Sequence, residues 1–275
     1  MGIGAQLVMW DPRFRAALVE RGFQVIRFDH RDIGGSTRLN HLPVPRPLPT
    51  ITRGFFGLPV AAPYTLSDMA RDVIGLCDGL GIERAHVLGV SMGGMIAQHL
   101  AIEHPTRIAS LTSIMSTTGG RYVPKPRAVR GLLTPIGKTV EEAEVRFLAM
   151  WRVIGSPAYP PDEARLRGVA REAFARGISP RGFLRHLAAI MASGDRTKRL
   201  ASVRAPTVVL HGREDPLVPR AAGRATAKAI PGARYVEFPG MGHDLPAALH
   251  ARFVEEFVAV AAKAAPMPTA RAIAS

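Results

Sequence analysis

The residues best suited to chemistry lie between His86 and Ile96, in the segment HVLGVSMGGMI. An apolar run typical of a β-strand leads into Gly-x-Ser-x-Gly around Ser91, and a helix-forming run follows from Met92 to Glu103. A serine on a sharp turn between strand and helix is the arrangement of a nucleophile elbow. Its hydroxyl then projects at the helix N-terminus, where free N–H groups and the helix dipole stabilise a developing negative charge. The segment therefore predicts a serine nucleophile.

Glycines at positions 89 and 93 support this interpretation, because they lack the Cβ atoms that would clash as strand and helix close around the serine. A phosphate-binding loop is another use of such a turn. It would require G-x-x-x-x-G-K-[ST] or G-x-G-x-x-G, and neither occurs here. Taken alone, the segment still allows an ordinary glycine-rich turn.

A serine hydroxyl needs a base that is oriented by a third group. After an elbow of this kind the partners follow along the chain as Asp or Glu and then His. Asp215 follows a strand-like run, and His243 lies on a glycine-rich loop after the strand-like run that ends at Phe238. Both come just past the carboxyl ends of expected strands, where open α/β sheets hold their ligands. We therefore predict a triad of Ser91, Asp215 and His243.

Four neighbouring groups compete for the roles of acid and base: Glu214, Asp244, His211 and His250. His211 ends a predicted strand and His250 falls within the last predicted helix, so neither lies on a presenting loop. The acid could also follow the strand at 108–115, but residues 116–118 are Ser-Thr-Thr and offer no carboxylate. These considerations favour Asp215.

The elements that must position these residues alternate between strand-like and helix-like runs. Strands are predicted at 23–28, 86–90, 108–115, 207–210 and 234–238. Helices are predicted at 11–21, 66–80, 92–103, 220–230 and 246–262, and the Pro- and Gly-rich segment 42–63 is predicted to be a long loop. This pattern predicts an α/β fold with a mostly parallel sheet flanked by helices.

The alternation stops between 119 and 202, where helices are predicted at 141–154, 162–176 and 181–192. We predict a helical cap over 119–202, inserted into a core formed by 1–118 and 203–265, with a flexible tail at 266–275. The cap would cover the substrate pocket, which we expect Met150, Trp151 and Met241 to line. Core packing alone can also produce such apolar spacing.

The composition narrows the functional classes. The chain has 275 residues, of which 47% are hydrophobic, and its single cysteine, Cys77, excludes an intramolecular disulfide and a four-cysteine zinc site. No apolar run approaches the roughly 20 residues of a membrane span, and no signal peptide is evident. We expect a cytoplasmic protein.

The net charge is +14, from 36 Lys and Arg against 22 Asp and Glu. A basic chain can bind nucleic acid or an anionic surface. Here the arginines are scattered, with no dense block and no aromatic-interleaved strand. We expect these basic residues to lie on the solvent-exposed surface of an enzyme that has neither a nucleic-acid nor a membrane partner.

Five motifs together resemble a known family: GIGAQ at 2–6, DHRDIGGS at 29–36, GVSMGGMIAQ at 89–98, GREDPLVP at 212–219 and PGMGHDLP at 239–246. The chain resembles the α/β-hydrolase superfamily over nearly its whole length, and most of all the serine esterases similar to aclacinomycin methylesterase. Asp32 favours this narrower group, because the wider superfamily often has glycine there.

The resemblance implies that Ser91 is the nucleophile, His243 the general base and Asp215 the residue that orients it. It further implies an oxyanion hole made by the backbone N–H groups of Met92 and Ile3, a small-molecule ester as substrate, and no metal or organic cofactor. Family members have strands before the loop that opens this sequence. Those strands are absent from this sequence, so we expect either that the true start lies upstream of Met1 or that part of the sheet is lost, in which case the oxyanion hole would be loosened.

Other functions remain open. An enol-lactonase or a carbon–carbon bond hydrolase would use the same triad, and a small-molecule receptor could retain it, since fold does not fix function. A nucleic-acid binder would depend on charge alone. Serine rather than aspartate at the elbow argues against dehalogenase or epoxide-hydrolase chemistry. The resemblance favours hydrolysis of a carboxylic ester through an acyl-enzyme.

Overall fold

The computed structural model describes residues 1–135 and 137–266, so the predicted tail lies almost wholly outside the described residues. Within them the sheet has four parallel strands in the order β1 (Ala85–Val90), β2 (Ile108–Ile114), β3 (Thr207–Gly212) and β4 (Arg234–Phe238). β2 and β3 are buried throughout, as central strands of a parallel sheet are. The predicted α/β fold is confirmed.

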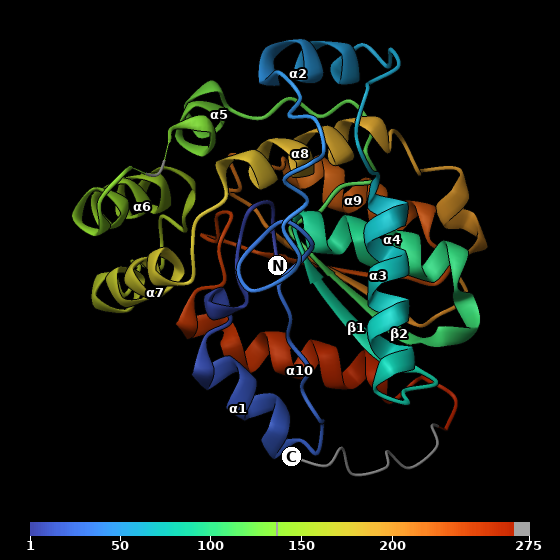
Figure 1. The fold of residues 1–275 in the computed structure, drawn as a ribbon. Coiled ribbons are helices and arrows are strands. Elements are labelled where there is room, and N and C mark those ends of the chain that lie inside the picture. Colours follow the sequence, from blue (N-terminus) through green and yellow to red (C-terminus); the bar gives the residue numbers. More distant parts are fainter. Residues whose placement is uncertain (136, 267–275) are drawn as a thin grey trace.

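Helices cover both faces of this sheet (Figure 1). One face packs against α1 (Pro12–Glu20) and α10 (His250–Ala261), which share a core cluster with Val90, Ile114 and Leu210. The other carries α3 (Leu66–Gly79), α4 (Met92–Glu103) and α9 (Arg220–Ala229). Short 3-10 helices lie at Leu7–Met9, Pro105–Arg107, Arg199–Ser202 and Ala247–Leu249.

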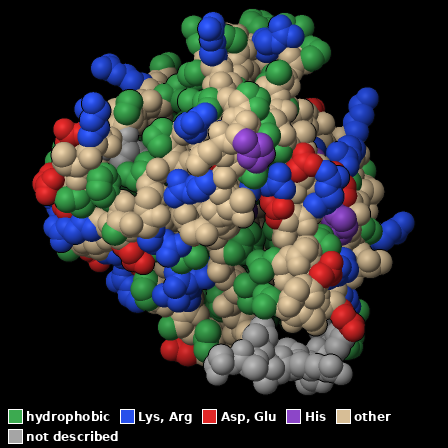
Figure 2. Space-filling model, viewed as in Figure 1, with side chains coloured by type: hydrophobic (Ala, Val, Ile, Leu, Met, Phe, Trp, Pro, Cys, Tyr) green, Lys and Arg blue, Asp and Glu red, His purple; other side chains and the backbone are tan. Residues whose placement is uncertain are grey.

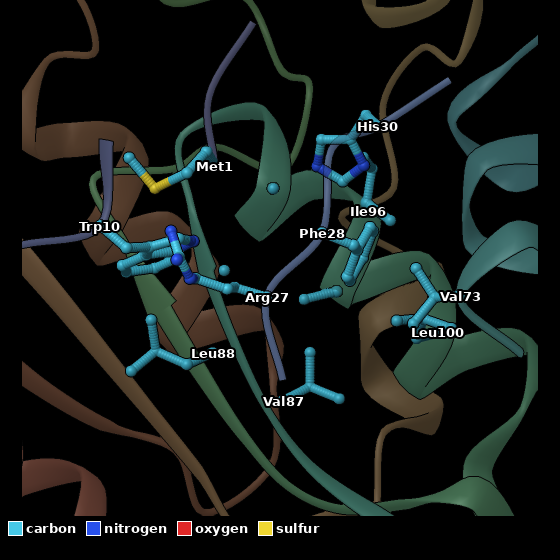
Figure 3. Close-up of a pocket in the computed structure, with 13 residues that line it drawn as sticks. Met1, Trp10, Arg27, Phe28, His30, Val73, Val87, Leu88, Ile96 and Leu100 are labelled. Atoms are coloured by element: carbon cyan, nitrogen blue, oxygen red, sulfur yellow. The ribbon is translucent and has the colours of Figure 1, made fainter. Parts of the chain in front are cut away.

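The predicted strand at 23–28 is wrong, because this stretch has no strand pairing. A cavity of about 70 Å³ lies between the end of this stretch and β1 (Figure 3). Arg27 and Phe28 line one side of it, and Val87 and Leu88 of β1 line the other. A strand requires a hydrogen-bonded neighbour, and the cavity separates this stretch from the β1 edge.

Two helices went unpredicted in stretches dense with proline. The expected loop at 42–63 contains α2 (Pro47–Phe55), and α5 (Pro126–Leu133) lies in the predicted cap. Each has a proline at its first position, where the missing N–H costs nothing. α2 packs on α8 (Pro180–Ala192), where a Cβ at Gly54 would lie 2.8 Å from the Cβ of Met191. That tertiary contact supports a helix that the local sequence does not indicate.

The segment between β2 and β3 also holds α6 (Val140–Ile154), α7 (Glu163–Ala175) and α8, close to the predicted helices. α5, α6 and α7 lie to one side of the sheet in Figure 1, and α8 crosses above the core. Thr139, Asp162 and Ser179 cap the N-termini of α6, α7 and α8 with their side-chain oxygens. Whether this segment is a separate cap remains a prediction.

The surface in Figure 2 carries Lys and Arg side chains in several separate groups with acidic side chains between them. None of the helices in the described part of the chain is long and apolar enough to cross a bilayer.

Candidate active site

Ser91 occupies the tight turn between β1 and α4 in a backbone conformation that non-glycine residues rarely adopt, with φ 55° and ψ −118°. Its N–H donates to the carbonyl of Ile114 at 2.9 Å, which fixes the turn against β2. A Cβ at Gly89 would overlap the carbonyl of Gly93, as the sequence indicated. A Cβ at Gly93 would instead lie 2.7 Å from the carbonyl oxygen of Met1.

The structure brings the three predicted triad residues together, each less than a tenth exposed. The Nε2 atom of His243 lies 3.1 Å from the Ser91 Oγ, and its Nδ1 atom lies 2.7 Å from an Asp215 carboxylate oxygen. Because a carboxylate only accepts hydrogen bonds, Nδ1 carries the proton and Nε2 accepts from the serine hydroxyl. This is the geometry required of a base that activates a nucleophile.

Asp215 is held in place by the turn that follows β3. Its other carboxylate oxygen accepts from the N–H groups of Leu217 and Val218 at 2.9 and 2.8 Å. These bonds leave one oxygen for His243, so the carboxylate is fixed in a single orientation.

The loop that carries His243 is held by the end of α6. The His243 N–H donates to the carbonyl of Ile154 at 2.7 Å, and the Gly242 N–H donates to the Ser156 hydroxyl at 2.9 Å. Ser156 in turn donates to Asp244, whose carboxyl pKa is raised by burial. Sequence reasoning missed Ser156, because nothing near it along the chain points to the loop it supports.

The predicted oxyanion donors lie on two elements that meet at the serine. Met92 is the first residue of α4, and Ile3 follows Gly2, where an added Cβ would lie 3.4 Å from the Ser91 Cβ. In the described part of the chain, neither amide donates to a protein acceptor. Both are therefore free to bind a ligand oxygen.

The competing acids and bases have other partners. Glu214 accepts from the Gly240 N–H at 2.6 Å. The Nε2 atoms of His211 and His250 lie 2.8 and 3.2 Å from the backbone carbonyls of Val218 and Leu245 respectively. Each of these groups stabilises a turn instead of facing the serine.

Of the three residues predicted to line the pocket, two lie on α6 and one lies on the loop that carries His243. Met150 and Trp151 lie on α6, and the Trp151 ring packs edge-on against Phe147 at 5.9 Å between centroids. The indole N–H of Trp151 is buried and has no acceptor among the described residues. Met241 is fully buried in the core cluster on the sheet, where packing alone accounts for it. The cavity in Figure 3 contains none of the triad.

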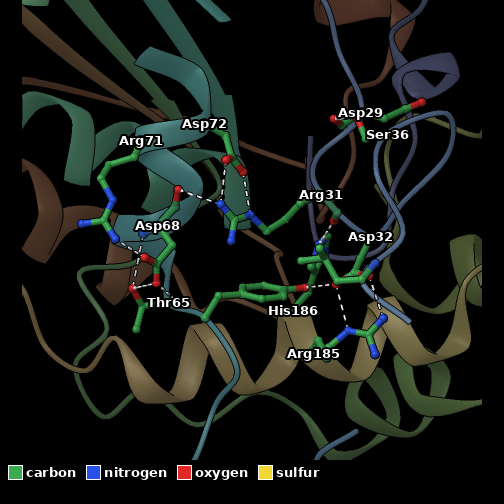
Figure 4. A network of polar contacts seen from close by, with 12 residues as sticks. Asp29, Arg31, Asp32, Ser36, Thr65, Asp68, Arg71, Asp72, Arg185 and His186 are labelled. Atoms are coloured by element: carbon green, nitrogen blue, oxygen red, sulfur yellow. Dashed lines mark hydrogen bonds and ion pairs between the residues drawn. The ribbon is translucent and has the colours of Figure 1, made fainter. Parts of the chain in front are cut away.

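Asp32, which the sequence singled out, is the centre of a buried polar cluster (Figure 4). Arg185 of α8 donates to both of its oxygens at 2.8 and 2.6 Å, and neither side chain is exposed. The Tyr64 hydroxyl and the Leu39 N–H add bonds of 2.7 and 2.8 Å. Asp32 adopts φ 71°, so a strained turn is held by α8 through a charged pair.

No group of three or more His, Cys, Asp or Glu in the described ranges could hold a metal ion. The groups that the structure brings into contact are the Ser91 hydroxyl, the His243 imidazole and the Asp215 carboxylate.

A parallel sheet that carries such an elbow defines a hydrolase of the α/β fold, and comparison with known proteins agrees. The α/β hydrolase fold family matches residues 2–130. The rhodomycin D methylesterase DnrP of Streptomyces peucetius is 30% identical over 264 residues, covering 88% of this chain and 82% of that protein. The chain belongs to the α/β-hydrolase family, and the expected likeness to the aclacinomycin methylesterase type is confirmed.

Two further relatives show the range of chemistry nearby. The putative carbamate hydrolase RutD of Caulobacter segnis is 27% identical, covering 88% of this chain and 82% of that protein. The crystal structure of the enol-lactonase from Burkholderia xenovorans LB400 superposes with a TM-score of 0.68 at 26% identity, covering 95% of this chain and 89% of that one.

Proposed function

We propose that the protein hydrolyses a small-molecule carboxylic ester through an acyl-enzyme on Ser91. The observation that carries this proposal is the line of contacts from Ser91 through His243 to Asp215 at the nucleophile turn. The similarity to a methylesterase over most of the chain supports an ester as the substrate class.

In the proposed reaction, His243 takes the hydroxyl proton as Ser91 attacks the ester carbonyl carbon. The resulting oxyanion binds to the N–H groups of Met92 and Ile3. His243 then gives its proton to the departing alcohol, which leaves an acyl group on Ser91. Asp215 stabilises the charged imidazole throughout. A water molecule, deprotonated by His243, finally releases the carboxylic acid and restores the serine.

A lactone is the second candidate substrate, because it is an internal ester and the enol-lactonase shares this fold at 26% identity. The same groups would act, but the alcohol would remain tethered to the product. We propose that the segment 119–202 covers the substrate and limits its size. Met150 and Trp151 of α6 are the residues of this segment that we propose to line the substrate pocket.

The test is hydrolysis of short and medium p-nitrophenyl esters and of a lactone panel, with Ser91→Ala as control. We expect turnover that depends on Ser91, and covalent labelling of Ser91 by a fluorophosphonate. Labelling without turnover of any ester or lactone would favour carbon–carbon bond hydrolysis. Absence of both from folded protein would favour a receptor and refute the proposal.

A further inference from the structure

His186 of α8 is a buried imidazole that bridges two stretches of main chain. Its Nδ1 atom accepts the N–H of Gly4 at 3.3 Å, and its Nε2 atom lies 2.8 Å from the carbonyl oxygen of Arg31. Because a backbone N–H can only donate, Nδ1 is unprotonated and Nε2 carries the hydrogen that Arg31 accepts. One neutral tautomer therefore satisfies both contacts.

The turn held in this way is the one that presents the proposed oxyanion donor. Gly4 follows Ile3 directly, and the Ala5 N–H donates to the Gly2 carbonyl at 3.2 Å, so residues 2–5 form one tight turn. Gly4 has φ 65°, and a Cβ there would lie 2.8 Å from the Phe183 ring on α8. α8 therefore packs directly against the turn, and Gly2 of this turn lies beside Ser91, since a Cβ added there would be 3.4 Å from the Ser91 Cβ.

The neighbouring residue fixes α8 itself. Arg185 joins α8 to the buried carboxylate of Asp32, and a Cβ at Gly182 would lie 2.9 Å from the Asp32 Cβ (Figure 4). The pair between Arg185 and Asp32 thus fixes the position of His186 independently of its contact with Gly4. Arg185 and His186 are successive residues of α8. Arg185 holds the turn at Asp32, and His186 holds the turn at Gly4 beside the serine.

We propose that His186 is a positioning residue for the oxyanion hole: it holds the Gly2–Ala5 turn so that the Ile3 N–H faces the substrate carbonyl oxygen. This inference rests on the proposed function. Burial lowers the pKa of His186 to about 4, so its Nδ1 stays an acceptor at the pH where a histidine base works. Ser91, His243 and Asp215 come from other elements, and among the described residues no hydrogen bond joins His186 to any of them.

Two amide substitutions separate the contacts of the imidazole. In His186→Asn the side-chain oxygen can take the place of Nδ1 and accept from Gly4, whereas the bond to Arg31 is lost. In His186→Gln the terminal amide can take the place of Nε2 and donate to Arg31, whereas the acceptor for Gly4 is lost. The two variants form a matched pair, because each keeps one of the two hydrogen bonds.

The measurements are kcat and KM with the best ester, melting temperature, and hydrogen exchange of the peptide containing Gly4. Removing one oxyanion donor costs about 10²–10³ in rate, and misplacing it should cost part of that. We expect His186→Gln to lower kcat by about 10- to 100-fold with little change in KM and to speed exchange at Gly4. His186→Asn should stay close to wild type in both readouts.

Equal kcat in the two variants, or fast exchange in His186→Gln with unchanged kcat, would overturn the inference. A fall in kcat that follows the melting temperature in both variants would mean that His186 only stabilises the fold. If wild type lacks Ser91-dependent turnover, the proposed function fails instead. Exchange at Gly4 then still tests whether His186 holds the turn: equal exchange in both variants would overturn the inference, and faster exchange only in His186→Gln would support this part of it.

Discussion

The buried pair between Asp32 and Arg185 makes a sharp prediction for Asp32→Asn. Asparagine has nearly the same shape and tolerates the positive φ of 71° at this position. Tyr64 and Leu39 donate to different oxygens of Asp32, so the single amide oxygen of asparagine keeps an acceptor for only one of them. The substitution therefore keeps the shape of the side chain but removes the negative charge and one of the two acceptor oxygens. Arg185 is left as a fully buried cation that has lost its negatively charged partner.

The size of the effect follows from burial. Breaking a fully buried ion pair by removing one partner costs roughly 3–5 kcal/mol, whereas a surface pair is worth about 0–1 kcal/mol. For a chain of this size, 1 kcal/mol corresponds to about 2–4 °C. We expect Asp32→Asn to lower the unfolding free energy by about 3–5 kcal/mol, and the melting temperature by roughly 6–20 °C.

Urea unfolding at neutral pH measures this loss, and Asp72→Asn provides the control. Asp72 pairs with Arg31 in the same network at 2.6 Å, but its side chain is 44% exposed (Figure 4). That variant should lose no more than about 1 kcal/mol. A loss in Asp32→Asn that is no larger than in the control would refute the argument from burial.

The dependence on pH gives a second check on the same pair. Burial acts to raise the pKa of Asp32, but bonds from Arg185, Tyr64 and Leu39 outweigh it and hold that pKa below its ordinary value. A depressed carboxyl pKa contributes stability that is complete above the unfolded value of about 3.9 and is lost as the pH falls through the folded value. The gap between wild type and variant should be constant from about pH 5 to 8 and narrow in acid. A gap that widens below pH 4 would contradict the assignment.

Three further predictions concern the site and its supports. Asp215→Asn should leave the fold intact but lower kcat by about 10⁴, because the imidazole loses the acceptor that fixes its tautomer; steady-state kinetics measures this. Ser156→Ala should lower the unfolding free energy by about 1–3 kcal/mol and reduce kcat, because it leaves the Gly242 N–H buried without a partner beside His243; unchanged kcat would show that the loop holds itself. Gly54→Ala should cost about 1–3 kcal/mol by forcing α2 away from α8, and limited proteolysis should then cut α2 faster than in wild type.

The triad was accessible from the sequence because each member follows an apolar run that has to be a buried strand. Parallel strands place their carboxyl ends at one edge of the sheet, so residues far apart along the chain meet there. The glycines at 89 and 93 likewise indicated the tight turn, in which Ser91 adopts a positive φ. The strand predicted at 23–28 was wrong because the residue types of that stretch favour a strand but cannot supply the neighbouring strand with which it must pair.

The supports of the site lie where local pattern carries no such information. Ser156, Arg185 and His186 belong to the segment between β2 and β3. The spacing of the apolar residues in this segment indicates only that it contains helices, and says nothing of what these polar residues contact. Asp32 shows the limit most clearly, because its partner Arg185 lies 153 residues further along the chain. A charge in an apolar surrounding demands a partner, so the sequence could raise the question of what pairs with Asp32. Only the packing of α8 against that turn answers it, and the same packing brings His186 to the turn beside the serine.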